Sequence, residues 1–106
     1  MKMGLPVIHK NKSAKISHLF ARSEYFAIID KTNKTYEIIE NPYFKMDAGI
    51  GQSVTELLLS HDVRAFIGYE IGLNMQQIAK KQKIQLIVIK PNFTKLEQVL
   101  ELIKIK

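Results

Sequence analysis

The chain has 106 residues, 46% of them hydrophobic and 25% charged, a composition that predicts one globular domain over residues 1–106 and excludes a disordered chain. It contains no cysteine, which excludes disulfides, a thiolate nucleophile and an iron–sulfur cluster held by the chain's own thiolates. No apolar run reaches the roughly 20 residues that cross a bilayer, so we expect a cytoplasmic protein with no membrane partner. The net charge of +6 favours acidic partners, but dispersed lysines carry most of it, so we expect no nucleic-acid binding.

The first half of the chain has the pattern of three strands. Residues 3–8 form a short apolar run in which Pro6 predicts a missing ladder bond. Residues 25–30 and 35–40 are β-branched and aromatic runs around a short polar connection, which predicts a hairpin. Between the first two strands, residues 17–22 favour one or two turns of helix with Ser17 as the cap.

The second half alternates helices with strands. Ser53 and Glu56 form a capping-box pattern, so a helix is predicted to begin at or just before Ser53 and to end near residue 61. Residues 63–67 are a buried strand closed by Gly68, and residues 73–82 are a second helix. Residues 84–89 are a nearly continuous apolar run, typical of a central strand covered on both faces. Thr94 and Glu97 form another capping-box pattern before a final amphipathic helix.

The predicted order is therefore β-β-β-α-β-α-β-α, an α/β fold. Right-handed crossovers make the strands at 63–67 and 84–89 parallel, and the hairpin supplies an antiparallel edge. We expect a three-layer structure with a mixed five-stranded sheet and flanking helices. The first and fourth strands then end side by side, and a crevice opens there.

Residues 41–53, here named the hinge loop, join the two halves. They are predicted to border that crevice together with residues 68–72 and the turn around Arg22. Gly49 and Gly51 allow a tight turn and a close approach to a ligand, because neither carries a Cβ. The unpaired N–H groups of the following helix would attract an anion. The alternative interpretation is a glycine-containing loop that only turns the chain into the helix.

Few side chains suggest chemistry. The first strand holds no carboxylate, which disfavours a two-metal hydrolase, and the sequence has no nucleophile elbow, dinucleotide fingerprint or P-loop lysine, so we expect no enzyme. His18 is placed to face the crevice, although a surface histidine is the alternative. Arg22 suits an anionic ligand. Met46 in the hinge loop is a candidate soft ligand for a metal, and His18 is a second candidate metal ligand through its imidazole nitrogens.

Several short motifs in this order carry a family resemblance. They are Pro6-Val7 in the first strand, a segment from Ser17 to Phe26 similar to Ser-x-His-Phe-Gly-Arg-x-x-x-Phe, Glu40-Asn41-Pro42 after the hairpin, the glycine loop, Gly68, and Ile71-Gly72. Together they make nearly the whole chain resemble the dinitrogenase iron-molybdenum cofactor-binding family. The resemblance implies a ribonuclease H-like fold and a small protein that carries, or helps to assemble, molybdenum–iron–sulfur clusters.

By position, the resemblance implies cofactor-binding roles for a set of residues to which we add His18. The set carried over is Phe20, Arg22, Asn41, Pro42, Gly49, Gly51, Gly68 and Gly72. The chain departs from the pattern at Leu19, which stands at the family's histidine position, and at Ala21, which stands at its glycine position. His18 lies one residue earlier and on a helix would point about 100° away.

The residues and the resemblance together support two classes of function. The leading hypothesis is a non-enzymatic carrier of an iron-molybdenum or related metal–sulfur cluster, or of a compact anion, with cofactor-assembly proteins as partners. The alternative is a protein-interaction module of the same fold that has lost cluster binding and acts through partners or as a homodimer. A nuclease of related fold is a third hypothesis, disfavoured by the missing carboxylate.

Overall fold

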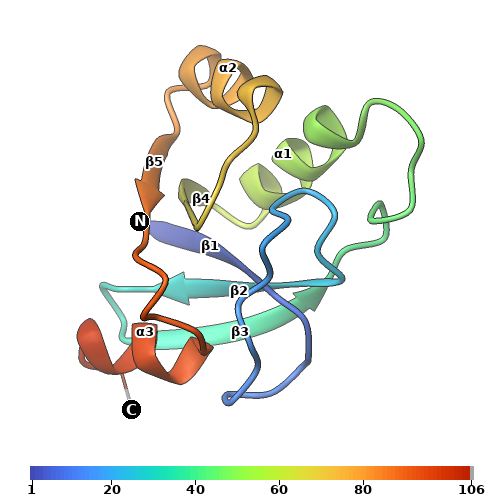
Figure 1. Cartoon of the computed structure of the whole chain (residues 1–106). Helices are drawn as coiled ribbons and strands as arrows, with labels where there is room; N and C mark the ends of the chain where they lie inside the picture. Colours follow the sequence, from blue (N-terminus) through green and yellow to red (C-terminus); the bar gives the residue numbers. More distant parts are fainter. Residues whose placement is uncertain (106) are drawn as a thin grey trace.

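The computed structural model describes residues 1–105, and its elements follow the predicted order β-β-β-α-β-α-β-α (Figure 1). Lys106, the last residue of the predicted domain, lies outside the described part. The strands are β1 (Lys2–Val7), β2 (Tyr25–Asp30), β3 (Thr35–Glu40), β4 (Val63–Gly68) and β5 (Gln85–Val88). The helices are α1 (Ile50–Ser60), α2 (Leu73–Lys81) and α3 (Leu96–Leu102).

The strands form one mixed sheet in the order β3-β2-β1-β4-β5, which confirms the predicted fold class. β1 pairs antiparallel with β2 and parallel with β4, so it is the central strand. β2 and β3 form the antiparallel hairpin at one edge, and β5 pairs parallel with β4 at the other. The carboxyl ends of β1 and β4 therefore lie side by side, as expected.

Each face of the sheet carries its own core, because side chains alternate along the strands. On β2, Phe26 and Ile28 pack towards α1 and α2, and Ala27 and Ile29 pack towards α3. Figure 1 shows α1 and α2 on one side of the sheet and α3 on the other. Throughout residues 1–105, the helices are too short or too polar to cross a lipid bilayer.

The predicted helix at residues 17–22 is wrong, because this segment forms turns. The Ser17 hydroxyl accepts a hydrogen bond from the Leu19 N–H at 3.1 Å and donates one to the Leu19 carbonyl at 3.0 Å. A hydroxyl that bonds to the backbone only two residues away closes a local turn and does not cap a helix.

Both predicted capping boxes are also wrong in position. α1 begins at Ile50, and the Ser53 N–H already donates to the Gly49 carbonyl at 3.2 Å inside the helix. At α3, the Gln98 side-chain oxygen, and not that of Glu97, accepts from the N–H groups of Thr94 and Lys95 at 2.7 and 2.9 Å. At α3 Gln98 thus takes the place predicted for Glu97, whereas α1 starts without a side-chain cap.

The prediction that residues 84–89 form a central strand is also wrong, although both faces of the run are partly covered. β5 is the edge strand of the sheet, Leu86 and Ile87 are half-buried, and Val88 is 69% exposed. The run is apolar because its two faces contact the helices, although one side of its backbone has no strand neighbour among residues 1–105.

Candidate functional site

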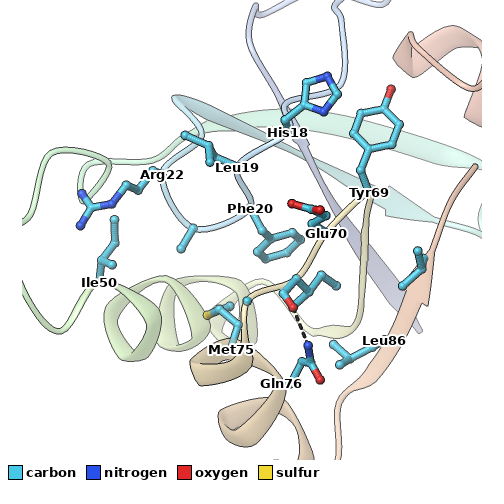
Figure 2. A pocket seen from close by; sticks show the side chains of 14 residues that line it. His18, Leu19, Phe20, Arg22, Ile50, Tyr69, Glu70, Met75, Gln76 and Leu86 are labelled. Carbon is cyan, nitrogen blue, oxygen red and sulfur yellow. Dashed lines mark hydrogen bonds between the residues drawn. The ribbon is translucent and has the colours of Figure 1, made fainter. Parts of the chain in front are cut away.

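A groove of about 700 Å³ lies at the carboxyl ends of β1 and β4 (Figure 2). Residues 17–23 cross the end of β1, because the Ser17 N–H donates to the Pro6 carbonyl and the Ser23 hydroxyl to the Val7 carbonyl, both at 2.9 Å. These residues, the loop after β4, the starts of α1 and α2, and β5 line the groove. A crevice at the point where neighbouring strands of an α/β sheet send their chains in different directions is where such folds bind ligands.

Phe20 forms part of the groove floor and anchors the turn that carries it. Its ring is buried and lies 4.9 Å from the Phe66 ring and 5.3 Å from the Phe26 ring, centroid to centroid. A Cβ placed on Gly68 would lie 3.4 Å from the Phe20 ring, at ordinary contact distance, so Gly68 lies directly against Phe20. Both are predicted site residues, but Phe20 lines the groove and Gly68 does not.

Asn41 holds the backbone behind the groove and does not line it. Its side chain is buried, its Nδ2 donates to the carbonyls of Ala21 and Ser23 at 2.9 and 2.8 Å, and its Oδ1 accepts from the Tyr43 N–H at 3.0 Å. These bonds join the turn before β2 to the start of the hinge loop. Asn41 therefore fixes the position of the turn from which Arg22 extends.

Arg22 reaches from that turn to the hinge loop. Its Nη1 donates to the carbonyl oxygen of Met46 at 2.8 Å, and the side chain lies beside Ile50 at the start of α1 (Figure 2). No carboxylate in the described chain pairs with it. Its remaining N–H donors are available to a ligand, because a guanidinium carries five. Met46 contributes its carbonyl to this contact and does not line the groove.

Two helices begin at the groove without acidic or side-chain caps. α1 starts after Gly49, whose φ of 73° is readily adopted by glycine, and α2 starts after Gly72. Neither helix has an acidic residue in its first turn, and Ile50 and Gly72 both line the groove. The unpaired N–H groups and the helix dipoles therefore place partial positive charge there.

Gly51 lies on the side of α1 that contacts α2. A Cβ at this position would lie 3.0 Å from the Asn74 amide nitrogen and 3.1 Å from the Met75 sulfur. The residue thus lets the two helices approach closely and brings their N-terminal ends to the same groove. It does not line the groove itself.

His18 lies at the opposite end of the groove from Arg22 (Figure 2). Its ring stacks on Tyr69, with the ring centroids 4.7 Å apart and the planes 25° apart. The Tyr69 hydroxyl donates to the Phe93 carbonyl, and partial burial raises the pKa of the phenol above its ordinary value. The phenol is therefore neutral at physiological pH and fixes the histidine ring at the rim.

Tyr69 and Glu70 lie within the residues 68–72 that were expected at the crevice but were not named as site residues, and Gln76 was missed. Tyr69 and Glu70 follow Gly68 directly and line the groove, and the Gln76 amide holds the same loop by donating to the Ile71 carbonyl at 2.7 Å. The residues after a buried parallel strand are where ligand contacts are expected, so the position directly after Gly68 was the available signal.

The groove does not provide a ligand set for a bare metal ion. Among residues 1–105, no group of three or more His, Cys, Asp or Glu side chains is placed to bind one. The groove offers the His18 imidazole and the Glu70 carboxylate, while the Met75 sulfur is buried and accepts from the Thr55 hydroxyl at 3.9 Å. Its apolar floor, Arg22 and helix N-termini suit a preformed anion better.

The fold and the groove define a small α/β domain with a crevice, bordered by Arg22 and two helix N-termini, at one end of a mixed sheet. The chain belongs to the dinitrogenase iron-molybdenum cofactor family, whose model matches residues 1–105. Comparison with curated proteins found no match.

Three solved structures share the fold. The crystal structure of PH0822 matches with a TM-score of 0.80 and 18% identity, covering 98% of this chain and 91% of that one. A Thermotoga protein, TM1290, provisionally described as a NifB protein of the DUF35 family, matches with a TM-score of 0.77 and 26% identity, covering 94% and 83%. The apo form of the orange protein from Desulfovibrio gigas matches with a TM-score of 0.82 and 13% identity, also covering 94% and 83%.

Proposed function

We propose that this protein is a non-catalytic carrier that binds an iron-molybdenum cofactor, or a related anionic metal–sulfur cluster, in the groove. The observation that carries the proposal is the meeting of two uncapped helix N-termini with Arg22 at one cavity. Membership of a family named for this cofactor supports the choice of ligand. Cofactor-assembly proteins would be its partners, and the cytoplasm its location.

Capture would rest on charge and shape. The Arg22 guanidinium, held in place by the Met46 carbonyl, would donate to the cluster, and the first N–H groups of α1 and α2 would do the same. The apolar floor formed by Phe20 and its neighbours lowers the local dielectric, which strengthens these contacts. With no cysteine in the chain, the cluster would keep most of its own ligands, and the His18 imidazole at the rim would be the candidate nitrogen ligand.

In this proposal the non-catalytic role rests on membership of a family named for a cofactor. Among residues 1–105, His18, Tyr69 and Glu70 line the groove without hydrogen bonds to one another.

The test is a titration of the purified protein, followed by thermal shift and absorbance. The probes are the iron-molybdenum cofactor, tetrathiomolybdate, molybdate and simple divalent metals. A ligand that binds only the native state adds about 2.7 kcal/mol of stability at a hundredfold excess over its Kd. We expect a shift with the cofactor or tetrathiomolybdate and none with the divalent metals.

Arg22→Ala should weaken binding by about tenfold or more, because a charge-assisted hydrogen bond contributes about 1.5–3 kcal/mol. Arg64→Ala is the matched control, since it removes the same charge from an exposed position on β4 outside the groove. Equal binding by the Arg22→Ala variant and the parent would overturn electrostatic capture in the groove.

A second candidate function is a protein-interaction module that has lost cluster binding. The observation that favours it is Leu19, which replaces the expected histidine and is 61% exposed at the groove. This candidate predicts that the protein stays colourless and unshifted with every probe, and that a defined cofactor-assembly protein binds it in a Leu19-dependent manner.

A further inference from the structure

The outer side of β5 has no strand neighbour within residues 1–105. The Ile89 N–H donates to the Gly68 carbonyl at 3.0 Å, so the backbone groups of Ile87 and Ile89 point towards β4. Because backbone direction alternates along a strand, the N–H and C=O groups of Leu86 and Val88 point to the open side. Such a row of unpaired groups is a template for another strand.

The two edges of the sheet differ in how they are protected. β3, at the far edge, carries Glu37 and Glu40, and Glu37 lies 3.4 Å from the His61 ring. Charged side chains of this kind discourage edge-to-edge pairing. Residues 84–89, Ile-Gln-Leu-Ile-Val-Ile, carry no charge and no proline. β5 is thus the edge open to a further strand.

Apolar side chains flank the β5 edge on both faces of the sheet. Val88 is 69% exposed at the groove, and on the other face Leu102 is 65% exposed beside a hollow of about 190 Å³ that is also lined by Ile87, Ile89 and Phe93. An added strand would direct alternate side chains onto these two surfaces. An extended, uncharged segment with apolar side chains fits these two surfaces, and residues 84–89 are such a segment.

We propose that β5 pairs antiparallel with β5 of a second copy of the chain, about a two-fold axis at Ile87. In this register, Leu86 and Val88 of one copy exchange N–H···O bonds with Val88 and Leu86 of the other. Ile87 faces its own copy in a non-hydrogen-bonded pair, with Cα atoms about 4.5 Å apart. Lys90 lies opposite Ile84 and Lys83 opposite Pro91, so no two lysines are directly opposed.

The proposed dimer belongs to the class of weak, transient protein–protein complexes. One short strand per copy forms an interface below the ~1,200 Å² of standard stable complexes. Association therefore depends on protein concentration. It joins the two sheets into one, and it places each groove, through Val88, next to the junction between the copies.

Single-cysteine variants test both the pairing and its register, because the parent chain has no cysteine. Ile87→Cys should form an interchain disulfide under mild oxidation, since a Cα separation of about 4.5 Å falls within disulfide geometry. Gln85→Cys is the matched control on the same face, because in this register Gln85 lies opposite Ile89 and far from its own copy. Equal cross-linking of the two variants, or of neither, would overturn the register.

Sedimentation of the parent protein over a concentration series tests the association itself. Val88→Lys should shift the protein to monomer, because it places two ammonium groups at diagonal positions across the strand pair, each opposite Leu86 of the other copy. Leu73→Lys, which adds the same charge at a residue 70% exposed on α2, should not. Thermal unfolding of each variant checks that the fold is intact. A parent protein that is monomeric at every concentration, or two lysine variants that behave alike, would contradict the proposal.

Discussion

Phe20 and Arg22 are two residues apart but act on different parts of the molecule. The Phe20 ring is buried between Phe26 and Phe66 and fixes the turn to the sheet. The Arg22 side chain leaves the same turn and contacts the hinge loop at Met46. Asn41 then bonds the carbonyls on either side of Arg22. The turn therefore serves stability through Phe20 and Asn41, and ligand contact through Arg22.

Tyr69 gives a pH-dependent prediction, because partial burial raises its pKa above the ordinary value of 10.0. A folded-state pKa above the unfolded one contributes stability that is fully present below pH 10.0 and is lost as the pH rises through the folded pKa. The melting temperature should therefore fall more steeply above this pH in the parent than in Tyr69→Phe.

Absorbance titration of the phenolates in the two proteins measures the same group directly. The difference between the parent and Tyr69→Phe should show one tyrosine that ionises above the ordinary value. A difference curve centred at or below that value, together with parallel melting curves, would contradict the prediction.

At the scale of elements, the contact between α1 and α2 depends on Gly51. In Gly51→Ala, the new Cβ would lie 3.0 Å from the Asn74 amide nitrogen and 3.3 Å from the Ile78 methyl. Overpacking costs about 1–3 kcal/mol, which exceeds the roughly 0.5–1 kcal/mol gained when alanine replaces a helical glycine. We expect the free energy of unfolding in urea to fall by about 1 kcal/mol.

Gly72→Ala is the control for this change. Gly72 has a φ of −58°, and a Cβ there would have no atom within 4 Å. Its free energy of unfolding should stay within about 0.5 kcal/mol of the parent. A Gly51→Ala variant as stable as Gly72→Ala would show that the helices separate at no cost.

Hydrophobic periodicity was sufficient to predict the order of the elements, because each buried face follows from local spacing. It failed where contacts with residues distant in the sequence determine the local structure. The turn at residues 17–22 is set by bonds to Pro6, Val7 and Asn41, none of which is local. The edge position of β5 follows from the order of the strands, since an apolar run has the same sequence pattern at an edge as at the centre.

The candidate site, like the fold, could be predicted from the sequence only in part. His18, Phe20, Arg22 and Gly72 were expected at the crevice, and the structure brings them to one groove. Asn41 and Gly51 lie behind it and position the turn and the helices. Tyr69 and Glu70 become neighbours of His18 and Phe20 only through the parallel pairing of β1 and β4, so their position directly after a buried strand indicates them and no local motif does.

At the scale of the whole molecule, a net charge of +6 acts in opposite directions on the two proposed interactions. It attracts an anionic cluster towards the groove and repels a second copy that carries the same charge. Neither effect depends on a single lysine, because the 16 basic residues are spread along the chain. Both act over distances at which dissolved salt screens them.

Raising the ionic strength should therefore weaken cluster binding and strengthen self-association. Between about 0.01 M and 1 M salt the Debye length falls from ~30 Å to ~3 Å, which removes most of the long-range attraction and repulsion. The two measurements are the Kd for tetrathiomolybdate by absorbance titration and the dimer Kd by sedimentation. Arg22→Ala should flatten the first salt dependence and leave the second unchanged, because Arg22 lies in the groove and away from β5 (Figure 2). If both dissociation constants moved in the same direction with salt, net charge would not govern the two interactions, and at least one would depend on contacts other than those proposed.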